Sequence, residues 1–358
     1  MSRKSLPSRG RGALSLPDNR FEKETREICP EVIDEAQSCN DTVLLPDTAR
    51  SVLCENESPD VGFSRSLNPY RGCEHGCIYC FARPTHAYLG LSPGLDFERR
   101  IFFKKDAAFL LERELDRKAY RCKPIALGIN TDSYQPTEEK LGITRSVLEV
   151  MVRVRHPLTI VTKSALIERD LDLLTALSAR RCLLVFISLP TLDEDLSGKL
   201  EPRATRPLRR LETIRRLSEA GIPVGVLVAP VIPGLTDHEL ERILESSRKA
   251  GALSAGYILL RLPLEVRPLF LEWLSHHYPD SAKKVEHRLR SFHGGGLYDS
   301  EFGTRMRGSG PLAELLLKRF EVAARRLGYG PMPELDSSGF APPVPPPRRS
   351  RLFPDFTP

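Results

Sequence analysis

The sequence lacks the features of a membrane-spanning or exported protein. Its 358 residues contain no run of roughly eighteen consecutive apolar residues, the length that a transmembrane helix needs. Residues 1–7 include basic side chains but no apolar stretch follows them, so we expect no secretory signal. Free cysteines would also suit a reducing compartment. We therefore expect a cytoplasmic protein.

Two common binding signatures are missing as well. No G-x-G-x-x-G segment follows a strand-like run, which argues against a dinucleotide-binding sheet. A structural zinc site usually combines two separated pairs of ligands, and no second pair of cysteines exists here. Outside one short stretch the cysteines occur singly, at Cys29, Cys39, Cys54, Cys122 and Cys182. A zinc-stabilised α/β protein is thus disfavoured, although it stays open as an alternative.

Three of the eight cysteines lie close together within residues 68–80. They are spaced C-x-x-x-C-x-x-C, at Cys73, Cys77 and Cys80. Gly72 and Gly76 allow the backbone to turn tightly around a metal centre. Three thiolates leave one position open on a four-coordinate ion or on an iron–sulfur cubane, and an open position can bind a reactant. His75 is a conceivable fourth ligand, but inside this loop we expect it to face solvent or to cap the turn.

This stretch resembles the cluster loop of the radical S-adenosylmethionine (radical SAM) enzymes, including the aromatic Tyr79 between the second and third cysteines. The run from Asn68 to His86 is similar to the subgroup named after spore photoproduct lyase, often labelled DNA-repair-photolyase-like. The resemblance extends over most of residues 61–330. It implies that the three cysteines hold a 4Fe-4S cluster whose fourth iron binds S-adenosylmethionine (SAM). It also implies an external one-electron donor of the flavodoxin or ferredoxin type.

Strand-like and helix-like segments alternate from about residue 64 onwards. Apolar runs predict strands at 66–71, 124–129, 158–162, 182–188, 224–229 and 254–260. Amphipathic runs predict helices at 106–120, 144–156, 167–179, 193–200, 207–220, 237–250, around 270–274 and at 311–327. In the first of these helices we expect Asp106 to be the cap and Phe109, Leu110 and Leu115 to lie on one face.

This alternation specifies a parallel α/β architecture. The resemblance implies its particular form, a partial (β/α)6 barrel of the radical SAM type with N- and C-terminal extensions, and an open doubly wound sheet is the alternative. We expect an N-terminal extension, partly flexible, over residues 1–60 and a radical SAM core over 61–265. A C-terminal helical extension over 266–334 and a proline-rich, disordered tail over 335–358 follow. Within the first part, Arg9–Gly12 predicts a mobile start or a segment that touches nucleic acid.

In parallel α/β barrels the reacting groups lie at the carboxyl ends of the strands. The residues at or after the predicted strand ends include Asn130, Thr131, Asp132, Lys163, Ser188, Ala229 and Arg261. Turn chemistry explains Asn130 and Thr131 as well as function does. For Lys163 and Ser188 we favour function, because a cation and a hydroxyl suit the carboxylate and ribose of SAM.

The resemblance adds roles for these positions. It places Lys163 and Ser188 among the SAM contacts, and Tyr79 near the adenine. Asp132 stands where many radical SAM enzymes have a Gly-Gly-Glu segment that receives the SAM amino group, and this sequence departs from that segment. Residues 225–233, which include Ala229, resemble the strand that flanks the adenine.

The substrate is the least determined part of the prediction. The resemblance implies a cysteine near the end of the second barrel strand that returns a hydrogen atom, yet residues 128–134 contain none, and Cys122 lies at the other end of that strand. Tyr134 could relay a radical or pack as an ordinary loop residue. We expect a radical SAM enzyme that abstracts hydrogen from another substrate, with nucleic acid as one candidate. The alternative is a nucleic-acid-binding protein with a structural or redox-sensing cluster.

Basic residues offer a weak hint about that substrate. The net charge of +6 is compatible with a phosphate-bearing substrate, as it is with many metabolic enzymes. The glycine-punctuated stretch 303–310 predicts a phosphate-binding loop or a solvated one. A nucleic-acid surface or an exposed helix face is predicted for Arg203, Arg206, Arg209 and Arg210.

Overall fold

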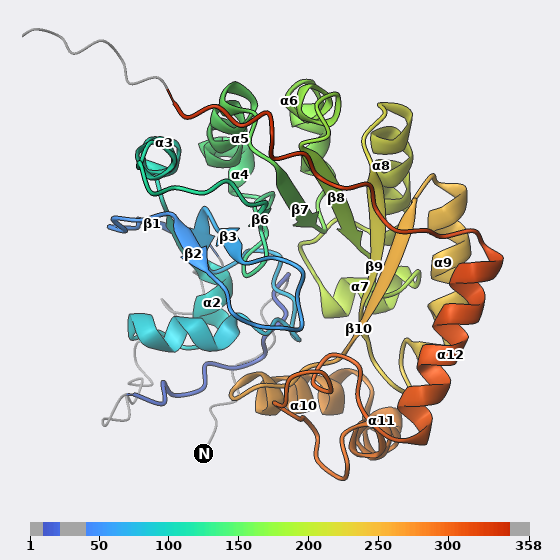
Figure 1. The fold of residues 1–358 in the computed structure, drawn as a ribbon. Coiled ribbons are helices and arrows are strands. Elements are labelled where there is room, and N and C mark those ends of the chain that lie inside the picture. The colour runs from blue at the N-terminus through green and yellow to red at the C-terminus, as the bar shows by residue number, and fades with distance from the viewer. Residues whose placement is uncertain (1–9, 22–40, 344–358) are drawn as a thin grey trace, which may run out of the picture.

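The computed structural model describes residues 10–21 and 41–343, and its centre is a seven-stranded sheet (Figure 1). The strands are β2 (Leu53–Glu55), β3 (Arg65–Leu67), β6 (Ile125–Leu127), β7 (Leu158–Thr162), β8 (Leu183–Ser188), β9 (Val224–Val231) and β10 (Ser254–Leu259). Their order is β10-β9-β8-β7-β6-β3-β2. From β3 to β10 each strand pairs in parallel with the next, and β2 joins β3 in antiparallel fashion. This confirms the predicted α/β fold.

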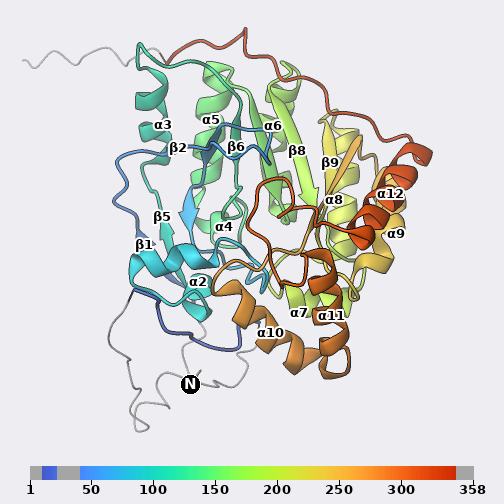
Figure 2. The same cartoon turned by 60° about the horizontal axis from the view of Figure 1, so that its bottom comes forward.

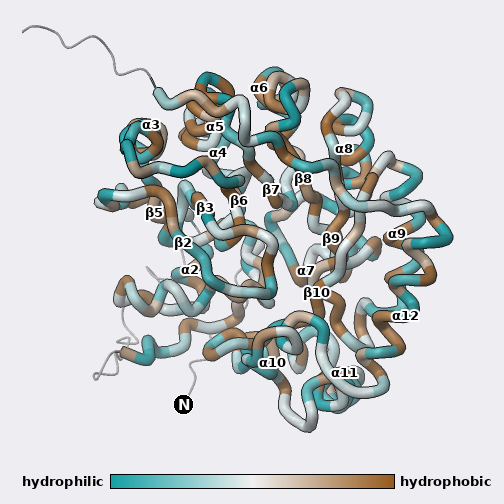
Figure 3. Tube along the Cα trace, in the orientation of Figure 1, coloured by the Kyte–Doolittle hydropathy of each residue, from teal (hydrophilic) through white to brown (hydrophobic). Residues whose placement is uncertain are grey.

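Helices cover the outer side of the sheet (Figure 1). They are α3 (Ala107–Leu115), α5 (Ile143–Val154), α6 (Leu171–Ser178), α8 (Pro207–Glu219) and α9 (Leu240–Lys249). One apolar core joins helices and strands, and it contains Leu148, Ile214 and Ile243 together with Ile160 and Val185. Figure 3 shows the hydrophilic residues of these helices on their outer sides. Alternation of strand and helix therefore gives the layering that the sequence predicts.

The strand register brings the carboxyl ends of neighbouring strands to one edge of the sheet. Thr162 of β7 lies opposite Ile187 of β8, and Ser188 lies opposite Leu227 of β9. Residues that follow β7 and β8 are therefore close neighbours. We call this the carboxyl edge, and we call the opposite end, where β6, β7 and β8 begin, the amino edge.

The single strand predicted over residues 66–71 is wrong. The chain breaks at Asn68 and Pro69, so that β3 belongs to the large sheet and β4 (Tyr70–Arg71) to a small one. The small sheet has the order β1-β5-β4, with β1 (Val43–Pro46) and β5 (Arg100–Phe103). Proline has no N–H for a strand ladder. Lys104 bonds both carbonyls at the break, from its backbone N to Pro69 O at 3.0 Å and from Nζ to Asn68 O at 2.6 Å.

The helix predicted over residues 106–120 is shorter and turned differently. It ends at Leu115, and Asp106 precedes it without a capping hydrogen bond from its side chain. Phe109 is 63% exposed, whereas Leu111 is fully buried. The correction follows from the helical period, since Ala107, Leu111 and Leu115 define the inner face and Phe109 lies away from it.

Later helices deviate in smaller ways. The helices predicted at 167–179 and 237–250 both open with 3-10 turns, η3 (Ala165–Asp170) and η4 (Asp237–Glu239). Helix α11 (Pro279–Phe292) was not predicted, although its buried residues Ala282, Val285, Leu289 and Phe292 have helical spacing. Charged residues between them obscure this period.

The C-terminal helices gather at the carboxyl edge. Helix α10 (Val266–His277) lies next to α7 (Glu194–Leu200) there (Figure 2), α11 contacts α10, and α12 (Pro311–Arg326) runs beside α9. A second apolar core joins α7 and α10 around Trp273, whose Nε1 donates to Lys199 O at 3.0 Å. None of the helices in the described parts of the chain is long and apolar enough to cross a membrane.

Residues 329–343, which we call the C-terminal belt, cross the amino edge (Figure 1). The belt is bonded along its length, from Gly330 N to Leu253 O at 3.1 Å, from Asp336 N to Arg181 O at 2.9 Å, and from Ala341 N to Val154 O at 3.0 Å. Residues 335–343 of the predicted tail are thus held against the core, and residues 344–358 lie outside the described residues. The domain boundaries drawn from the sequence stay predictions.

Candidate functional site

The three clustered cysteines follow β4 and are enclosed by the fold. All three are free, Cys73 and Cys77 are buried, and Cys80 is partly buried. Burial raises the pKa of the Cys77 thiol to about 12, and it also raises the pKa values of Cys73 and Cys80. Thiols in such surroundings become thiolates most readily when a bound cation stabilises the charge.

The donor set is compatible with an iron–sulfur cluster. No three His, Cys, Asp or Glu side chains within residues 10–21 and 41–343 come close enough to hold one metal ion. A cubane makes a different demand, because each of its cysteines binds a different iron and the sulfurs do not converge on one point. Three buried thiols without a fourth cysteine in the loop therefore fit a 4Fe-4S cluster that keeps one iron open.

His75 does not lie where the sequence suggested. It is buried rather than exposed, and its Nδ1 lies 3.4 Å from Oδ2 of Asp132. The expectation that His75 faces solvent is wrong because the loop after β6 covers the cluster loop. Asp132 thereby joins the cluster loop to the carboxyl edge.

The loop after β6 binds the backbone of the cluster loop on both sides of Cys73. Gln135 is fully buried, accepts a hydrogen bond from Glu74 N at 2.9 Å, and donates one to Gly72 O at 3.2 Å. Thr131 donates its hydroxyl proton to Tyr70 O at 2.7 Å. The sequence left turn chemistry and function as equal explanations for Thr131. In the structure, its side chain positions the cluster loop. No local pattern indicates a role for Gln135, because its partners lie about sixty residues away.

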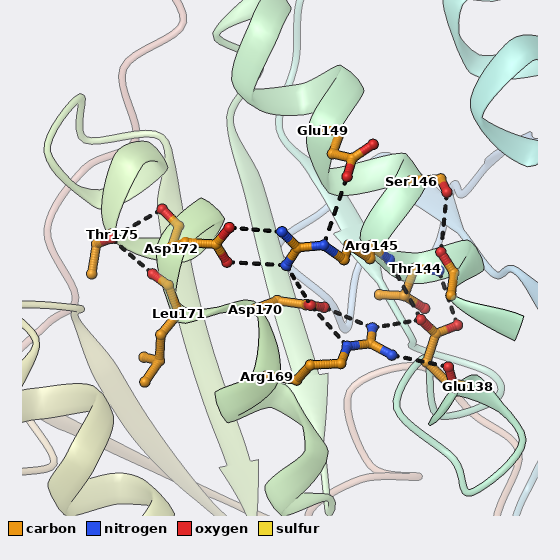
Figure 4. A network of polar contacts seen from close by, with 11 residues as sticks. Glu138, Thr144, Arg145, Ser146, Glu149, Arg169, Asp170, Leu171, Asp172 and Thr175 are labelled. Atoms are coloured by element: carbon orange, nitrogen blue, oxygen red, sulfur yellow. Dashed lines mark hydrogen bonds and ion pairs between the residues drawn. The ribbon is translucent and has the colours of Figure 1, made fainter. Parts of the chain in front are cut away.

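Figure 4 shows an ion network around Glu138, Arg169 and Asp170, and this network binds Tyr70 at the start of the cluster loop. The Tyr70 hydroxyl donates to Glu138, which also accepts from Thr144 N at 2.9 Å and pairs with Arg169 at 2.7 Å. Asp170 Oδ1 forms ion pairs with both arginines, with Arg169 Nε at 2.9 Å and with Arg145 Nη1 at 3.0 Å. The network holds the start of the cluster loop against α5 and η3.

A cluster of buried charges lies beside Cys77 at the carboxyl edge. Glu201 accepts hydrogen bonds from the Tyr79 hydroxyl and from Arg210. Lys163 places Nζ 6.0 Å from the centre of the Tyr79 ring. Burial would lower the pKa of Lys163, but negative charge at Cys77 and Glu201 holds it above the ordinary value. The raised pKa favours the charged form of Lys163.

The remaining site residues from the sequence divide into two groups. Ser188 donates its hydroxyl proton to Ala229 O at 3.0 Å, and Arg210 donates to Ser188 O at 2.8 Å, so these residues form one group with Lys163 and Tyr79. Asn130 belongs elsewhere, since its side chain is exposed and its N–H donates to Asn68 Oδ1 at 2.9 Å.

Asp132 is hydrogen-bonded to the residues at the end of β7. Its carboxylate accepts from Thr162 Oγ1 at 2.7 Å, from Lys163 N at 2.8 Å and from Tyr134 N at 2.9 Å. An ionised carboxylate offers about four acceptor positions, so these three donors leave capacity for one more. Beside this position, His75 Nδ1 lies 3.4 Å from Asp132 Oδ2 without forming a hydrogen bond.

Of the arginines predicted to form a nucleic-acid surface or an exposed helix face, Arg206 is exposed, Arg203 and Arg209 are partly buried, and Arg210 is buried. Arg210 is buried against Glu201, and Arg209 pairs with Glu168 at 2.6 Å. The other two contact Glu74 and the carbonyl of Glu194, through Arg203 at 3.1 Å and Arg206 at 3.0 Å. Arg210 departs from the prediction because residues 200–206 fold back over the cluster loop and place Glu201 beside it.

The glycine-punctuated stretch 303–310 is also engaged with the fold. Arg305 pairs with Asp60 and bonds Ser58 Oγ at 2.5 Å, while Met306 O accepts from Leu259 N at 2.8 Å. The stretch closes over β10 rather than standing free in solvent. Whether it binds phosphate stays a prediction.

These features define an α/β enzyme core that carries a three-cysteine loop at the carboxyl edge of a curved parallel sheet. The chain belongs to the radical SAM superfamily, whose family model matches residues 67–246. Among its relatives, an uncharacterized protein of Mycobacterium tuberculosis is 35% identical over 251 residues, which are 68% of this chain and 74% of the relative. Another, from Methanocaldococcus jannaschii, is 25% identical and aligns over 62% of this chain and 79% of its own.

Solved structures of spore photoproduct lyase share the fold. A variant of that enzyme with bound AdoMet and dinucleoside spore photoproduct aligns over 87% of each chain, with a TM-score of 0.59 and 14% identity. Another variant aligns over the same share with a TM-score of 0.58. The chain is thus an enzyme of the radical SAM type, and the superfamily implies a 4Fe-4S cluster and SAM as its cofactors.

Proposed function

We propose that Cys73, Cys77 and Cys80 hold the 4Fe-4S cluster and that SAM binds its open iron. The observation that carries the proposal is the arrangement of three free, enclosed cysteines beside Lys163 at the carboxyl edge. When bound, the reduced cluster and SAM supply a 5′-deoxyadenosyl radical that abstracts a hydrogen atom from the substrate. An external one-electron donor of the flavodoxin or ferredoxin type would provide the electron.

The side chains at the carboxyl edge would bind and orient SAM. The Lys163 cation is suited to a carboxylate, and the remaining acceptor capacity of Asp132 is suited to an amino group. Ser188 and Ala229, joined by their hydrogen bond, would line the ribose and adenine side, with Tyr79. Asn130, which is exposed at the same edge, is the outermost candidate.

Glu201 and Arg210 would keep this arrangement in place. They form an ion pair that also fixes the Tyr79 hydroxyl and the carbonyl of Ser188. A fully buried pair of this kind excludes water while leaving the single positive charge of Lys163 for the ligand. The protein thus contributes orientation and a dry site, which radical chemistry requires.

The substrate that we propose is unidentified, with nucleic acid as one candidate class. Spore photoproduct lyase, whose fold this chain shares, binds a dinucleoside spore photoproduct. Residues 128–134 lack a cysteine, and Cys122 is at the amino edge, just before β6. We therefore propose a molecule other than that lesion as the substrate of this chain. Tyr134 is fully buried and packs as a core residue.

Anaerobic reconstitution with iron and sulfide tests this function. After dithionite reduction, the protein should release 5′-deoxyadenosine from SAM, and candidate nucleic acids should raise the rate if one is the substrate. Stimulation that weakens steeply with salt would indicate phosphate contacts. A zinc-loaded, colourless protein would refute the proposal, and a cluster without SAM cleavage would favour a structural or redox-sensing role.

A further inference from the structure

Residues 10–21, which we call the N-terminal strap, lie against the outer side of the cluster loop. The predicted mobile start is therefore wrong for residues 10–12. Arg11 is buried and donates from Nη1 to Glu98 O at 2.7 Å. Gly12 N and Ala13 N donate to the two carboxylate oxygens of Glu98 at 2.9 and 2.8 Å. Asn19 continues the attachment with a bond to Ala87 O at 2.8 Å.

Glu98 also pairs with Arg83, and both side chains are fully buried. The guanidinium has five N–H donors, and five acceptors surround it. Its contacts are Cys77 O at 2.9 Å, Gly76 O at 3.1 Å, Gly94 O at 3.0 Å, Pro93 O at 3.3 Å and Glu98 Oε1 at 2.5 Å. Arg83 therefore holds the backbone of a proposed cluster ligand directly.

Two glycines allow the strap to approach this closely. A Cβ on Gly12 would lie 1.8 Å from Gly76 O, and a Cβ on Gly94 would lie 2.2 Å from Ser15 O. Neither position tolerates a side chain without moving backbone. The strap thus contacts the cluster loop at Gly76, the residue before Cys77. It also contacts Gly94, which directly precedes helix α2 (Leu95–Arg99), the helix that carries Glu98.

A buried ion pair adds little net stability compared with a well-packed apolar pair, so stability alone does not account for this arrangement. What the pair supplies is geometry, because each partner bonds backbone groups of segments far apart in the sequence. We propose that Arg83, Glu98 and strap residues 11–13 are positioning residues that fix Gly76 and Cys77 in the orientation the cluster needs. This inference rests on the proposed function, and it gives the N-terminal extension a role.

The test compares full-length variants after anaerobic reconstitution. Arg83→Lys loses the forked contacts to Gly76 and Cys77, Glu98→Gln disrupts the acceptors of the strap, and Gly12→Ala forces the strap away from Gly76 O. Matched controls are Glu241→Gln, which alters the ion pair to Arg319 between α9 and α12, and Gly62→Ala, where a Cβ would meet nothing within 4 Å.

Three readouts separate positioning from simple support of the fold. These are iron and sulfide per chain, the rate of iron loss to a chelator, and the electron paramagnetic resonance (EPR) spectrum of the reduced cluster. Substitution of a residue that supports a metal ligand typically lowers metal affinity by roughly 10–100-fold. We expect iron loss to be accelerated on that scale, with an altered EPR spectrum, in the three variants and not in the controls.

Each outcome decides something. An unchanged rate of iron loss and an unchanged spectrum in all three variants would overturn the positioning role. This holds even if the variants unfold at lower denaturant concentrations than the wild-type protein. If Glu98→Gln fails to fold, Gly12→Ala decides, because it keeps both charges. A wild-type protein that binds no cluster would overturn the proposed function and this inference together, whereas a wild-type cluster that the variants retain unchanged would overturn the inference alone.

Discussion

The two edges of the large sheet carry different kinds of side chain. At the carboxyl edge, Lys163, Glu201 and Arg210 bring charges into the interior next to the cysteines. At the amino edge the C-terminal belt lies beside an open hollow of about 350 Å³, which is lined by apolar and polar residues, among them Phe63, Leu184 and Glu334. The difference indicates that one edge is built for chemistry and the other for closure.

The largest expected difference between the edges concerns their cysteines. Cys77→Ala at the carboxyl edge should abolish cluster binding and SAM cleavage, because two thiolates do not retain the cluster. Cys182→Ala at the amino edge should leave both intact, since the Cys182 thiol lies in the apolar core and donates to backbone carbonyls, among them Arg180 O at 3.4 Å. Iron analysis and 5′-deoxyadenosine release measure both. Full iron content in Cys77→Ala would erase the proposed distinction.

Lys163→Ala should weaken SAM binding while the cluster remains. A charged hydrogen bond contributes about 1.5–3 kcal/mol, so we expect the dissociation constant to rise roughly tenfold or more. Equilibrium dialysis of reconstituted protein against labelled SAM measures it. The control is Lys249→Ala, because Lys249 lies on the surface and pairs only with Glu245 in the same helix. Equal affinities in both variants would remove Lys163 from the SAM site.

The amino edge should respond to acid through His156. Burial, followed by the charge of Arg65, lowers the pKa of His156 to about 4, against about 6.5 in an unfolded chain. The unfolded state therefore takes up the proton first, and the stabilisation that is complete above pH 6.5 declines as the pH falls towards 4, by up to about 3 kcal/mol.

Urea unfolding of His156→Gln checks this pH dependence. The variant should lose that part of the decline in unfolding free energy between pH 6.5 and 4, and it should keep its iron at pH 7.5. The exposed His238, changed to Gln, serves as control and should keep the wild-type slope. A wild-type slope in His156→Gln would contradict the assignment.

The smallest effect is expected for Phe340→Ala in the C-terminal belt. Phe340 packs on Tyr120 and His156, with ring centres 5.7 and 5.3 Å away, but it is only partly buried. We expect a loss of about 1–2 kcal/mol in unfolding free energy with no change in iron content. Loss of iron in this variant would show that the two edges are coupled, against the division argued above.

Local patterns were enough to predict the positions at the carboxyl edge. Parallel strands bring the residues that follow them to one edge, so Lys163 and Ser188 could be placed together without knowing the packing. The cysteine spacing located the cluster loop for a similar reason, since all its members lie within one short segment. Strand β7 was predicted residue for residue because its apolar run ends sharply.

The supporting residues could not be predicted in the same way. Tyr79 and Glu201 are 122 residues apart, and Gly12 and Glu98 are 86 apart, so no sequence window contains both partners. In a sequence, Arg83 and Arg210 also look like ordinary surface arginines, because burial of a charge depends on a partner brought by the fold. Long-range ion pairs are therefore where the structure adds most.

The most direct test of the account is the EPR spectrum of the anaerobically reconstituted, dithionite-reduced protein, recorded with and without SAM. We predict the signal of a reduced 4Fe-4S cluster that changes when SAM is added, because SAM binds the iron that has no cysteine ligand. A signal that SAM leaves unchanged, or a protein that binds zinc in place of iron at Cys73, Cys77 and Cys80, would contradict it.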